Sequence, residues 1–386
     1  MNTDKRGKNM KKTLVLLLAL ALCLSLVTAC STTKEAAAEV AESTAEKPQT
    51  ETAENSAEEA PADDTVYTLV ASSHTPSTAT MTTVFRNMLD EITARSNGRI
   101  QFDVYTDGTL AAADGILDAI ESGIADVACV NYSRVNGRLD LCGVMALPGV
   151  FSNSWEGSKA FLDIYADSAE IQKQFSNANV HLVSVAMGAA AGFLSTDPVN
   201  TLEDISGRKV IISNNYTAEI ITKLGATPLS FSGPEAYEAL SKGTADAWLT
   251  NLEAAAGFGA YEIAKNYYSL SFGVGPQVFV ISQKVYESLP EDLQQIIDEV
   301  GREFVPDDVY VTYTLERGKD VTSQEVFEEA GTTFVTPSEA EMSAFQDEYA
   351  SATWDEWAAD QGDAGSVVLD AYLTALEGRA GTCPEF

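Results

Sequence analysis

Short hydrophobic runs alternate with helical patterns in the first third of the chain. Apolar residues recur at three- and four-residue steps from Met81 to Ile92, which predicts an amphipathic helix. Runs of β-branched and aromatic residues, bounded by Gly, Asn or Asp, predict strands on either side of it. The predicted strands are 66–72, 100–105 and 124–131, and a second helix is predicted at 113–122. This order of strands and helices is typical of a parallel sheet flanked by helices.

A similar order returns in the middle of the chain. The predicted strands are 180–187, 209–212, 245–249 and 277–281, and the predicted helices are 216–224 and 235–242. In both parts a helix ends at a Gly, and Ala-Asp and a strand follow, as in Gly123-Ile124-Ala125-Asp126 and Gly243-Thr244-Ala245-Asp246. The repetition predicts two similar α/β domains. Further helices are predicted from Glu291, at 340–358 with Trp354 and Trp357 as packing residues, and at 367–376.

The first 64 residues have the composition of a targeting segment and a tether. Five basic residues precede an uncharged apolar run, 13–27, which is shorter than the roughly 20 residues of a membrane span. The sequence Val27-Thr28-Ala29-Cys30 resembles a bacterial lipobox, so residues 1–29 are expected to be a signal peptide and Cys30 to be lipidated. An ordinary signal peptide with a chance Cys is the alternative. Residues 30–64, rich in Ala, Glu, Thr and Ser, are expected to be a disordered acidic linker.

Charge and cysteine content narrow the class of protein. The 386 residues carry a formal net charge of −33, which argues against binding nucleic acid or an anionic membrane by charge. A hydrophobic content of 45% is enough for the cores of two domains. Cys129 and Cys142 could form a disulfide or remain buried thiols, and their spacing does not decide between the two.

The sequence offers little for catalysis. His74 and His181 are its two histidines, and no G-x-S-x-G, C-x-x-C, H-E-x-x-H or Walker pattern occurs. We therefore expect no catalytic residue, no metal and no cofactor. A lipoprotein hydrolase is the rival hypothesis, which would need turnover that depends on His74 or a nearby Ser.

The stretch Thr201 to Asn215 resembles the segment T-x-E-D-L-x-G-L-K-I-R-V-P of the substrate-binding proteins of TRAP transporters, the tripartite ATP-independent periplasmic systems. Other segments are similar to motifs of the same family and follow in the same order. These segments are His74 to Pro76, Gly98 to Leu110, Leu147 to Phe151, Leu224 to Asp246 and Ser282 to Gln294. The resemblance covers most of residues 66–297.

The resemblance implies a fold, a function and partners. The expected fold is an α/β two-domain clamshell of the periplasmic binding protein type II kind, with strands exchanged at the hinge and a long helix spanning both domains. Domain I is expected to comprise 65–188 and 277–316, and domain II 189–276 and 317–386. The implied function is to bind a small solute outside the membrane, as a monomer, and to deliver it to integral-membrane TRAP permease subunits. A sensor that serves a signalling partner is a further alternative.

The sequence departs from the family where the ligand is usually held. The family's carboxylate-binding Arg falls at Ile211, and a second Arg often found earlier falls near the uncharged Ala191-Gly192. Because Ile cannot make the paired charge-assisted bonds of Arg, a simple carboxylate held in the usual way is not expected. Arg134 and Arg208 are the nearest replacement cations, and Arg208 is expected to be a solvated turn residue.

The residues expected to line the ligand site stand at predicted strand ends, where open α/β sheets bind ligands. They are Ser72, Ser73, His74, Asn131, Tyr132, Arg134, Phe193, Ile211, Asn214, Tyr216, Trp248, Asn251 and Gln277. Aromatic and amide side chains dominate this set, which favours a neutral, aromatic or cationic solute. The alternative is an organic acid, similar to a C4-dicarboxylate, held by Arg134 as a displaced cation.

Overall fold

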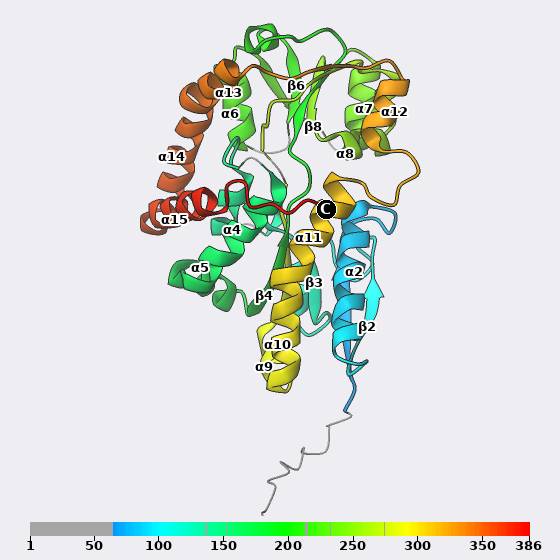
Figure 1. Ribbon diagram of the computed structural model, residues 1–386, viewed down its shortest axis with the longest axis vertical. Coiled ribbons are helices and arrows are strands. Elements are labelled where there is room, and N and C mark those ends of the chain that lie inside the picture. Colours follow the sequence, from blue (N-terminus) through cyan, green and yellow to red (C-terminus); the bar gives the residue numbers. More distant parts are fainter. Residues whose placement is uncertain (1–64, 136, 152, 213–214, 232, 274) are drawn as a thin grey trace, which may run out of the picture. The chain divides into compact units, whose positions relative to one another are not determined.

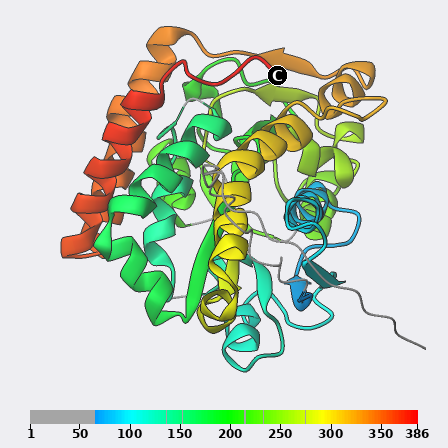
Figure 2. The same cartoon turned by 60° about the horizontal axis from the view of Figure 1, so that its bottom comes forward.

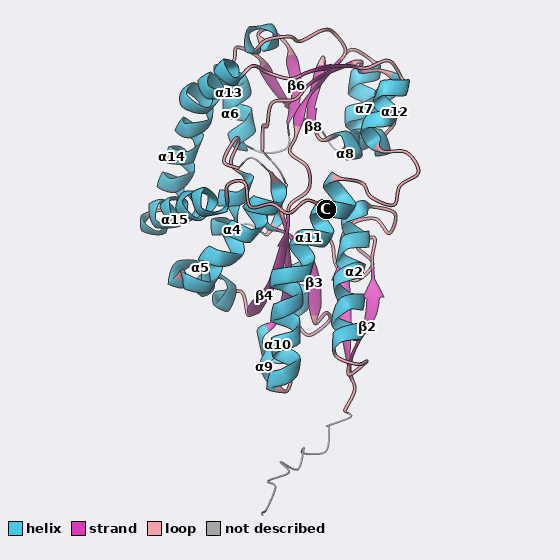
Figure 3. Ribbon diagram, in the orientation of Figure 1, coloured by secondary structure: helices cyan, strands magenta, loops and turns pink. Residues whose placement is uncertain are grey.

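The structure, a computed structural model, describes residues 65–386 except 136, 152, 213–214, 232 and 274. The signal segment, Cys30 and the linker therefore lie outside the described residues. The described chain forms two mixed β-sheets, and helices pack on each sheet (Figures 1 and 3). Together they make an α/β two-domain clamshell. We call the five-stranded sheet with its helices the first domain, and the six-stranded sheet with its helices the second domain.

The strands of the two sheets come from interleaved parts of the chain. The first sheet has the order β2 (Ile100–Tyr105), β1 (Tyr67–Ser73), β3 (Val127–Asn131), β10 (Gln277–Ser282) and β4 (Val180–Ala186). The second has the order β11 (Thr333–Val335), β9 (Asn266–Tyr268), β5 (Gly192–Ser195), β8 (Ala247–Thr250), β6 (Lys209–Ile212) and β7 (Thr227–Ser230). Strand β10 follows β9 in sequence but joins the other sheet, so the strand exchange expected at the hinge is confirmed.

Parallel and antiparallel pairs occur in both sheets. Strand β1 is parallel to β2 and β3, as the β-α-β-α-β order predicted, and β6 is parallel to β7 and β8. Strand β10 runs antiparallel to β3 and β4, and β5 runs antiparallel to β8 and β9. The sequence pattern did not indicate these antiparallel insertions.

The repeated Gly-x-Ala-Asp segment has the same role in both domains. The Asp126 carboxylate accepts a hydrogen bond from the Val70 amide at 2.8 Å, and the Asp126 amide donates to the Val70 carbonyl. The Asp246 carboxylate likewise accepts from the Lys209 amide at 2.7 Å, and its amide donates to the Lys209 carbonyl. Each Asp thus ties the start of its own strand to the neighbouring parallel strand. The predicted internal similarity of the two domains has a physical basis in this pair of bonds.

Helices cover both faces of each sheet. Those before the long helix are α2 (Thr80–Arg95), α3 (Ile116–Glu121), η1 (Tyr132–Arg134), η2 (Asp140–Ala146), α4 (Ser154–Asp167), α5 (Ala169–Asn177), η3 (Leu202–Ile205), α6 (Asn215–Lys223), α7 (Gly233–Ser241), α8 (Leu252–Gly257), η4 (Ala260–Glu262) and α9 (Gln283–Ser288). The apolar stripe predicted from Met81 to Ile92 is the buried face of α2.

The long helix is continuous from Glu291 to Thr314 and is drawn in yellow in Figures 1 and 2. It consists of α10 (Glu291–Glu299), η5 (Val300–Phe304), α11 (Val305–Val309) and η6 (Tyr310–Thr314), and the two η segments are π-helical. It packs against β4 and α2 of the first domain. Its last turn carries Tyr313 to Asn251 of the second domain, 3.5 Å away. The helix therefore contacts both domains.

The C-terminal helices also contact both domains. They are α12 (Ser323–Glu329), α13 (Glu339–Phe345), η7 (Gln346–Ala350), α14 (Ser351–Asp360) and α15 (Asp363–Arg379). Phe345 belongs to a core of the second domain, whereas Trp357 and Tyr372 are buried in a core of the first. Helices α14 and α15 lie side by side (Figures 1 and 2). The packing role predicted for Trp357 is confirmed, and the predicted domain boundaries stay a prediction.

Candidate functional site

Five of the predicted site residues meet at one edge of the first sheet. Strand β1 ends at Ser72 and Ser73, and Ser73 is paired with Cys129 of β3. Strand β3 ends at Asn131, which is paired with Gln277, the first residue of the antiparallel β10. His74 follows β1, and its Nδ1 lies 3.3 Å from the Cys129 carbonyl oxygen. The rule that ligands bind at the carboxyl ends of parallel strands makes this edge the first half of the candidate site.

These polar side chains differ in whether they already have hydrogen-bond partners within the protein. The Ser73 hydroxyl contacts Thr75 Oγ1 at 2.7 Å, and Asn131 Oδ1 accepts from the Ser133 amide and hydroxyl, which caps η1. Ser72 is fully buried, and its Oγ has no hydrogen-bond partner among the described residues. A buried hydroxyl without a partner carries a desolvation cost that a bound polar group would remove. Ser72 is therefore the hydroxyl of this edge that a bound polar group could satisfy.

Arg134 places a positive charge beside His74. It ends η1, directly after β3, and its side chain is exposed. Burial of His74 lowers the pKa of its imidazole, and the charge of Arg134 lowers it further, against the opposing effect of the Cys129 carbonyl. The histidine is thus held neutral, and the cation at this edge is Arg134. Tyr132 of the same turn is half-buried and packs against the core of the first domain.

Arg208, the other replacement cation considered, makes hydrogen bonds to its own loop. Its guanidinium donates to the carbonyl oxygens of Asp204 at 2.7 Å, Pro198 at 2.7 Å and Asp197 at 3.3 Å. The side chain therefore ties together the loop before β6. It is a half-buried turn residue that braces the loop.

Three predicted site residues of the second domain lie inside its cores. Phe193 on β5 is fully buried, with its ring centroid 6.2 Å from that of Phe272. Ile211 on β6 is fully buried and is paired in register with Trp248 on β8. Trp248 is 8% exposed, and its ring centroid lies 6.0 Å from that of Phe258. Ile211 and Trp248 share one apolar cluster, whereas Phe193 belongs to the other.

Asn251 follows β8 at the edge of the second sheet, and both ends of its amide are engaged. Its Oδ1 accepts from the Ala254 amide at 2.8 Å and so caps α8. Its Nδ2 donates to the Ala189 carbonyl at 3.4 Å and to the Tyr313 hydroxyl at 3.5 Å. Asn251 therefore connects the second sheet to the segment between β4 and β5 and to the long helix.

Some of the predicted residues cannot be placed. Asn214 lies outside the described residues, and so does the side chain of Tyr216. The structure adds aromatic residues that the sequence did not single out: Phe258 is 41% exposed beside Trp248, and Phe231, at the end of β7, is 37% exposed. The run Gly257-Phe258-Gly259 is a sequence signal that could have marked an aromatic side chain held at a turn.

The thiols and the metal-binding side chains are also located. Cys129 and Cys142 are both free and buried, and burial raises the pKa of the Cys129 thiol to about 12. Within the part of the chain that the structure describes, no group of three or more His, Cys, Asp or Glu could hold a metal ion. No helix in residues 65–386, the masked positions aside, is long and apolar enough to cross a membrane.

Comparison with known proteins identifies the family. The family model of bacterial extracellular solute-binding protein family 7, DctP, matches residues 70–360. The chain belongs to this family and is a TRAP transporter substrate-binding protein. Such proteins bind small solutes and work with membrane permease components.

Relatives and solved structures agree with this assignment. A solute-binding protein of Albidiferax ferrireducens is 23% identical over 284 residues, which cover 71% of this chain and 80% of the relative. The ectoine-binding periplasmic protein TeaA of Halomonas elongata is 21% identical over 280 residues, with the same coverage. A marine metagenome TRAP solute binding protein specific for aromatic acids, solved with 3-hydroxybenzoate, has a TM-score of 0.70 and 19% identity and covers 82% of this chain and 99% of its own. At this identity the last comparison shows the fold.

Proposed function

We propose that this TRAP protein captures a small solute between its two domains and hands it to a membrane permease, without catalysing a reaction. The edge formed by Ser72, His74, Asn131 and Gln277 supports a polar recognition surface on the first domain. Phe258, exposed beside the buried Trp248, supplies aromatic surface on the second. The single observation that carries the ligand class is the burial of Ile211.

An apolar Ile211 argues against the usual mode of holding an acid. The side chain is fully buried beside Trp248, inside an apolar cluster. A carboxylate buried there without a cation would cost several kcal/mol or become protonated. We therefore favour a neutral, aromatic or cationic solute, with stacking on Phe258, which is exposed beside Trp248, contributing about 0.5–2 kcal/mol.

One observation favours a second candidate. Arg134 is exposed at the edge of the first sheet and has no ion-pair partner among the described residues, and its charge acts on His74. A guanidinium in this position can form two parallel bonds with a carboxylate. An organic acid held from the first domain by Arg134 is the alternative ligand. The neighbour named for aromatic acids supports this alternative.

A thermal-shift screen of the purified protein separates these two classes. A solute at a hundredfold excess over its Kd raises the free energy of unfolding by about 2.7 kcal/mol. Neutral, aromatic and cationic solutes are expected to stabilise the protein, and the effect should shrink in Phe258→Ala. Strong stabilisation by simple dicarboxylates that is lost in Arg134→Gln would replace the main hypothesis with the alternative. Arg86→Gln, at an exposed position of α2, is the matched control.

We also propose that the mature chain begins at a lipidated Cys30 and is tethered by residues 31–64. The lipobox-like sequence and the acidic composition of the linker support this anchor. Expression of the whole chain and of Cys30→Ser in a bacterium with lipoprotein processing tests it. The parent is expected in the membrane fraction with an added lipid mass, and Cys30→Ser is expected in the soluble extracytoplasmic fraction. If both proteins distribute equally between the membrane and soluble fractions, the proposal of a lipid anchor is refuted.

A further inference from the structure

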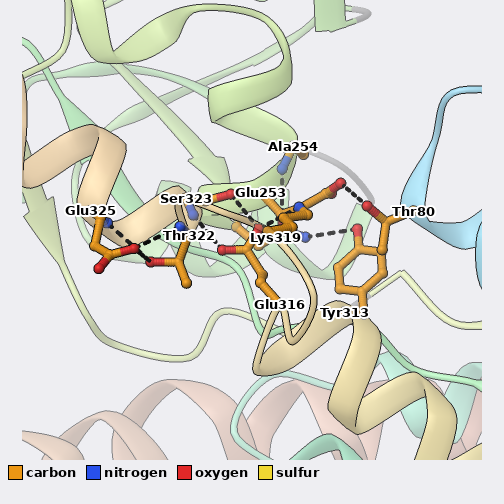
Figure 4. Close-up of polar contacts among 10 residues, drawn as sticks. Thr80, Glu253, Ala254, Tyr313, Glu316, Lys319, Thr322, Ser323 and Glu325 are labelled. Carbon is orange, nitrogen blue, oxygen red and sulfur yellow. Dashed lines mark hydrogen bonds and ion pairs between the residues drawn. The ribbon is translucent and has the colours of Figure 1, made fainter.

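A carboxylate of the second domain is hydrogen-bonded to the first domain. Glu253, in the first turn of α8, accepts a hydrogen bond from the hydroxyl of Thr80, the first residue of α2 (Figure 4). Strand β1 leads into α2, whose buried face packs in the first domain, whereas α8 follows β8 of the second sheet. The bond therefore joins elements that belong to different domains and are 173 residues apart in sequence.

Tyr313 of the long helix completes this contact. Its hydroxyl accepts from Asn251 Nδ2 at 3.5 Å. Burial raises the pKa of Tyr313 above its ordinary range, and the negative charge of the nearby Glu253 carboxylate raises it further, so the hydroxyl stays protonated. We name Thr80, Asn251, Glu253 and Tyr313 the interdomain cluster.

The interdomain cluster touches the segment that connects the two sheets. Residues 187–191 lead from β4 of the first sheet to β5 of the second. The Tyr313 ring lies over Gly188, where a β-carbon would approach a ring atom to 2.6 Å. Asn251 donates to the Ala189 carbonyl of the same segment. A rotation of one domain against the other has to move this connection, and so it has to change the contacts of the cluster.

We propose that Glu253 is a latch that holds the two domains in contact beside the hinge, by binding Thr80 of the first domain next to the contact between Asn251 and Tyr313 of the long helix. Opening of the domains separates α8 from α2, which leaves the carboxylate without its Thr80 donor. The closed arrangement is stabilised by these bonds, and their strength sets the fraction of molecules that are closed before any solute binds. A solute then needs less binding free energy to complete the closure.

The sequence gives no separate signal for the latch. Thr80 and Glu253 are ordinary first-turn residues of α2 and α8, and Tyr313 lies in a helix whose contacts depend on the fold. The cluster arises only when the chain has crossed between the domains. Since the latch acts on the domain arrangement and not on the solute, it can be tested without a ligand.

Two conservative substitutions remove one bond each. Thr80→Val keeps the shape of the side chain and deletes the hydroxyl that donates to Glu253. Tyr313→Phe deletes the hydroxyl that accepts from Asn251. Each change is expected to lower the ratio of closed to open molecules by about 2- to 10-fold, as for the loss of one ordinary hydrogen bond.

Matched controls make the same chemical changes within one domain. Thr83→Val removes an exposed hydroxyl from the same helix α2. Tyr286→Phe removes a hydroxyl that donates to Asp298 at 2.7 Å inside the first domain. Both controls are expected to leave the domain arrangement as in the parent. They also show whether the loss of any threonine or tyrosine hydroxyl is enough to disturb the protein.

Electron-spin distance measurement on the ligand-free protein reads the arrangement directly. Spin labels are attached at Lys173→Cys on α5 and at Lys242→Cys after α7, which are exposed positions of the first and the second domain, in a background with Cys383→Ser. The parent is expected to give a dominant short distance, and Thr80→Val and Tyr313→Phe are expected to shift population to longer distances.

Distance distributions of Thr80→Val and Tyr313→Phe that match the parent would overturn the latch. If Tyr313→Phe does not fold, Thr80→Val, at the half-buried end of a helix, still decides the question. Failure of the solute screen would leave these distances unaffected, so the two proposals fail separately.

Discussion

Replacing Gly301 with Ala should destabilise the first domain, because the long helix approaches β4 more closely there than a side chain allows. A β-carbon at Gly301 would lie 1.8 Å from the Val183 carbonyl oxygen and 2.7 Å from the Val183 carbonyl carbon. Both neighbours are backbone atoms, which cannot turn away as the end of a side chain can. The helix and the strand must therefore separate.

The size of the effect follows from that separation. Ordinary van der Waals contact begins at 3.4 Å, so the β-carbon and the carbonyl oxygen must move apart by 3.4 − 1.8 = 1.6 Å. Such a movement also stretches the hydrogen bond from Ser184 Oγ to the Gly301 carbonyl, which is 2.6 Å long. Overpacking costs about 1–3 kcal/mol and the lost bond about 1 kcal/mol, so the free energy of unfolding should fall by about 2–4 kcal/mol.

Urea unfolding of the parent and of Gly301→Ala, followed by circular dichroism, measures this difference. Gly378→Ala is the matched control, because it makes the same substitution in helix α15 where no atom lies within 4 Å of the added carbon. The control should be as stable as the parent or more stable by up to about 1 kcal/mol. A Gly301→Ala protein as stable as Gly378→Ala would refute the close packing of η5 on β4.

Two further predictions concern pH. Because the pKa of His74 is lowered in the folded protein, the unfolded chain binds more protons below about pH 6.5, so acid should destabilise the parent more than His74→Gln between pH 7.5 and 5; parallel Tm curves would contradict this. Burial of Glu316 raises its pKa, but hydrogen bonds from Lys319 and Ser323 outweigh burial and lower it overall, so its stabilisation is present above about pH 4.5 and is lost as the pH falls through the lowered pKa. Glu316→Gln should therefore unfold at lower temperature than the parent at pH 7, with a difference that shrinks below about pH 4; a constant difference would assign the effect to packing alone.

Local sequence signals were enough to predict the parallel strands of each sheet. The alternation of strand and helix predicted β1, β2 and β3 in parallel order, and the structure confirms it. The Asp of each repeated segment could be read as a marker of domain similarity, although its hydrogen bonds to Val70 and Lys209 could not. Hydrophobic periodicity and turn residues are properties of the sequence itself. Strands and helices marked by them can therefore be predicted without knowledge of the fold.

Short, fully buried strands escaped the sequence pattern. Strands β5 and β9 have four and three residues and lie between other strands of the second sheet. Their side chains are covered on both faces, so no alternation of polar and apolar positions marks them. The antiparallel place of β10 between β3 and β4 depends on the chain returning from the other domain, which a local pattern does not contain.

The candidate site could likewise be predicted only in part from the sequence. Strand ends can be predicted, and Ser72, His74, Asn131 and Gln277 indeed come together at one edge. Whether a side chain at a strand end faces a ligand or a core depends on the opposite face of the sheet. Phe193, predicted on the same grounds, is fully buried. The complete list of ligand contacts therefore stays a prediction.

The burial of Ile211 and the exposure of Arg134 pose one electrostatic question. A guanidinium at position 211 would stand in an apolar cluster beside Trp248, where a charge is tolerated only with a partner. If the family's Arg falls at position 211, as the resemblance implies, the second domain has apolar packing where that charge would stand, and Arg134 is the cation that we propose for a bound acid. Arg134 stands on the first domain, exposed and beside a histidine that its charge helps to keep neutral.

If Arg134 serves the ligand, the charged contact has moved from one domain to the other, and solute binding would begin on the first domain instead of the second. If it does not, the solute carries no carboxylate that needs a cation, and the aromatic surface of Phe258 beside Trp248 becomes the main source of affinity.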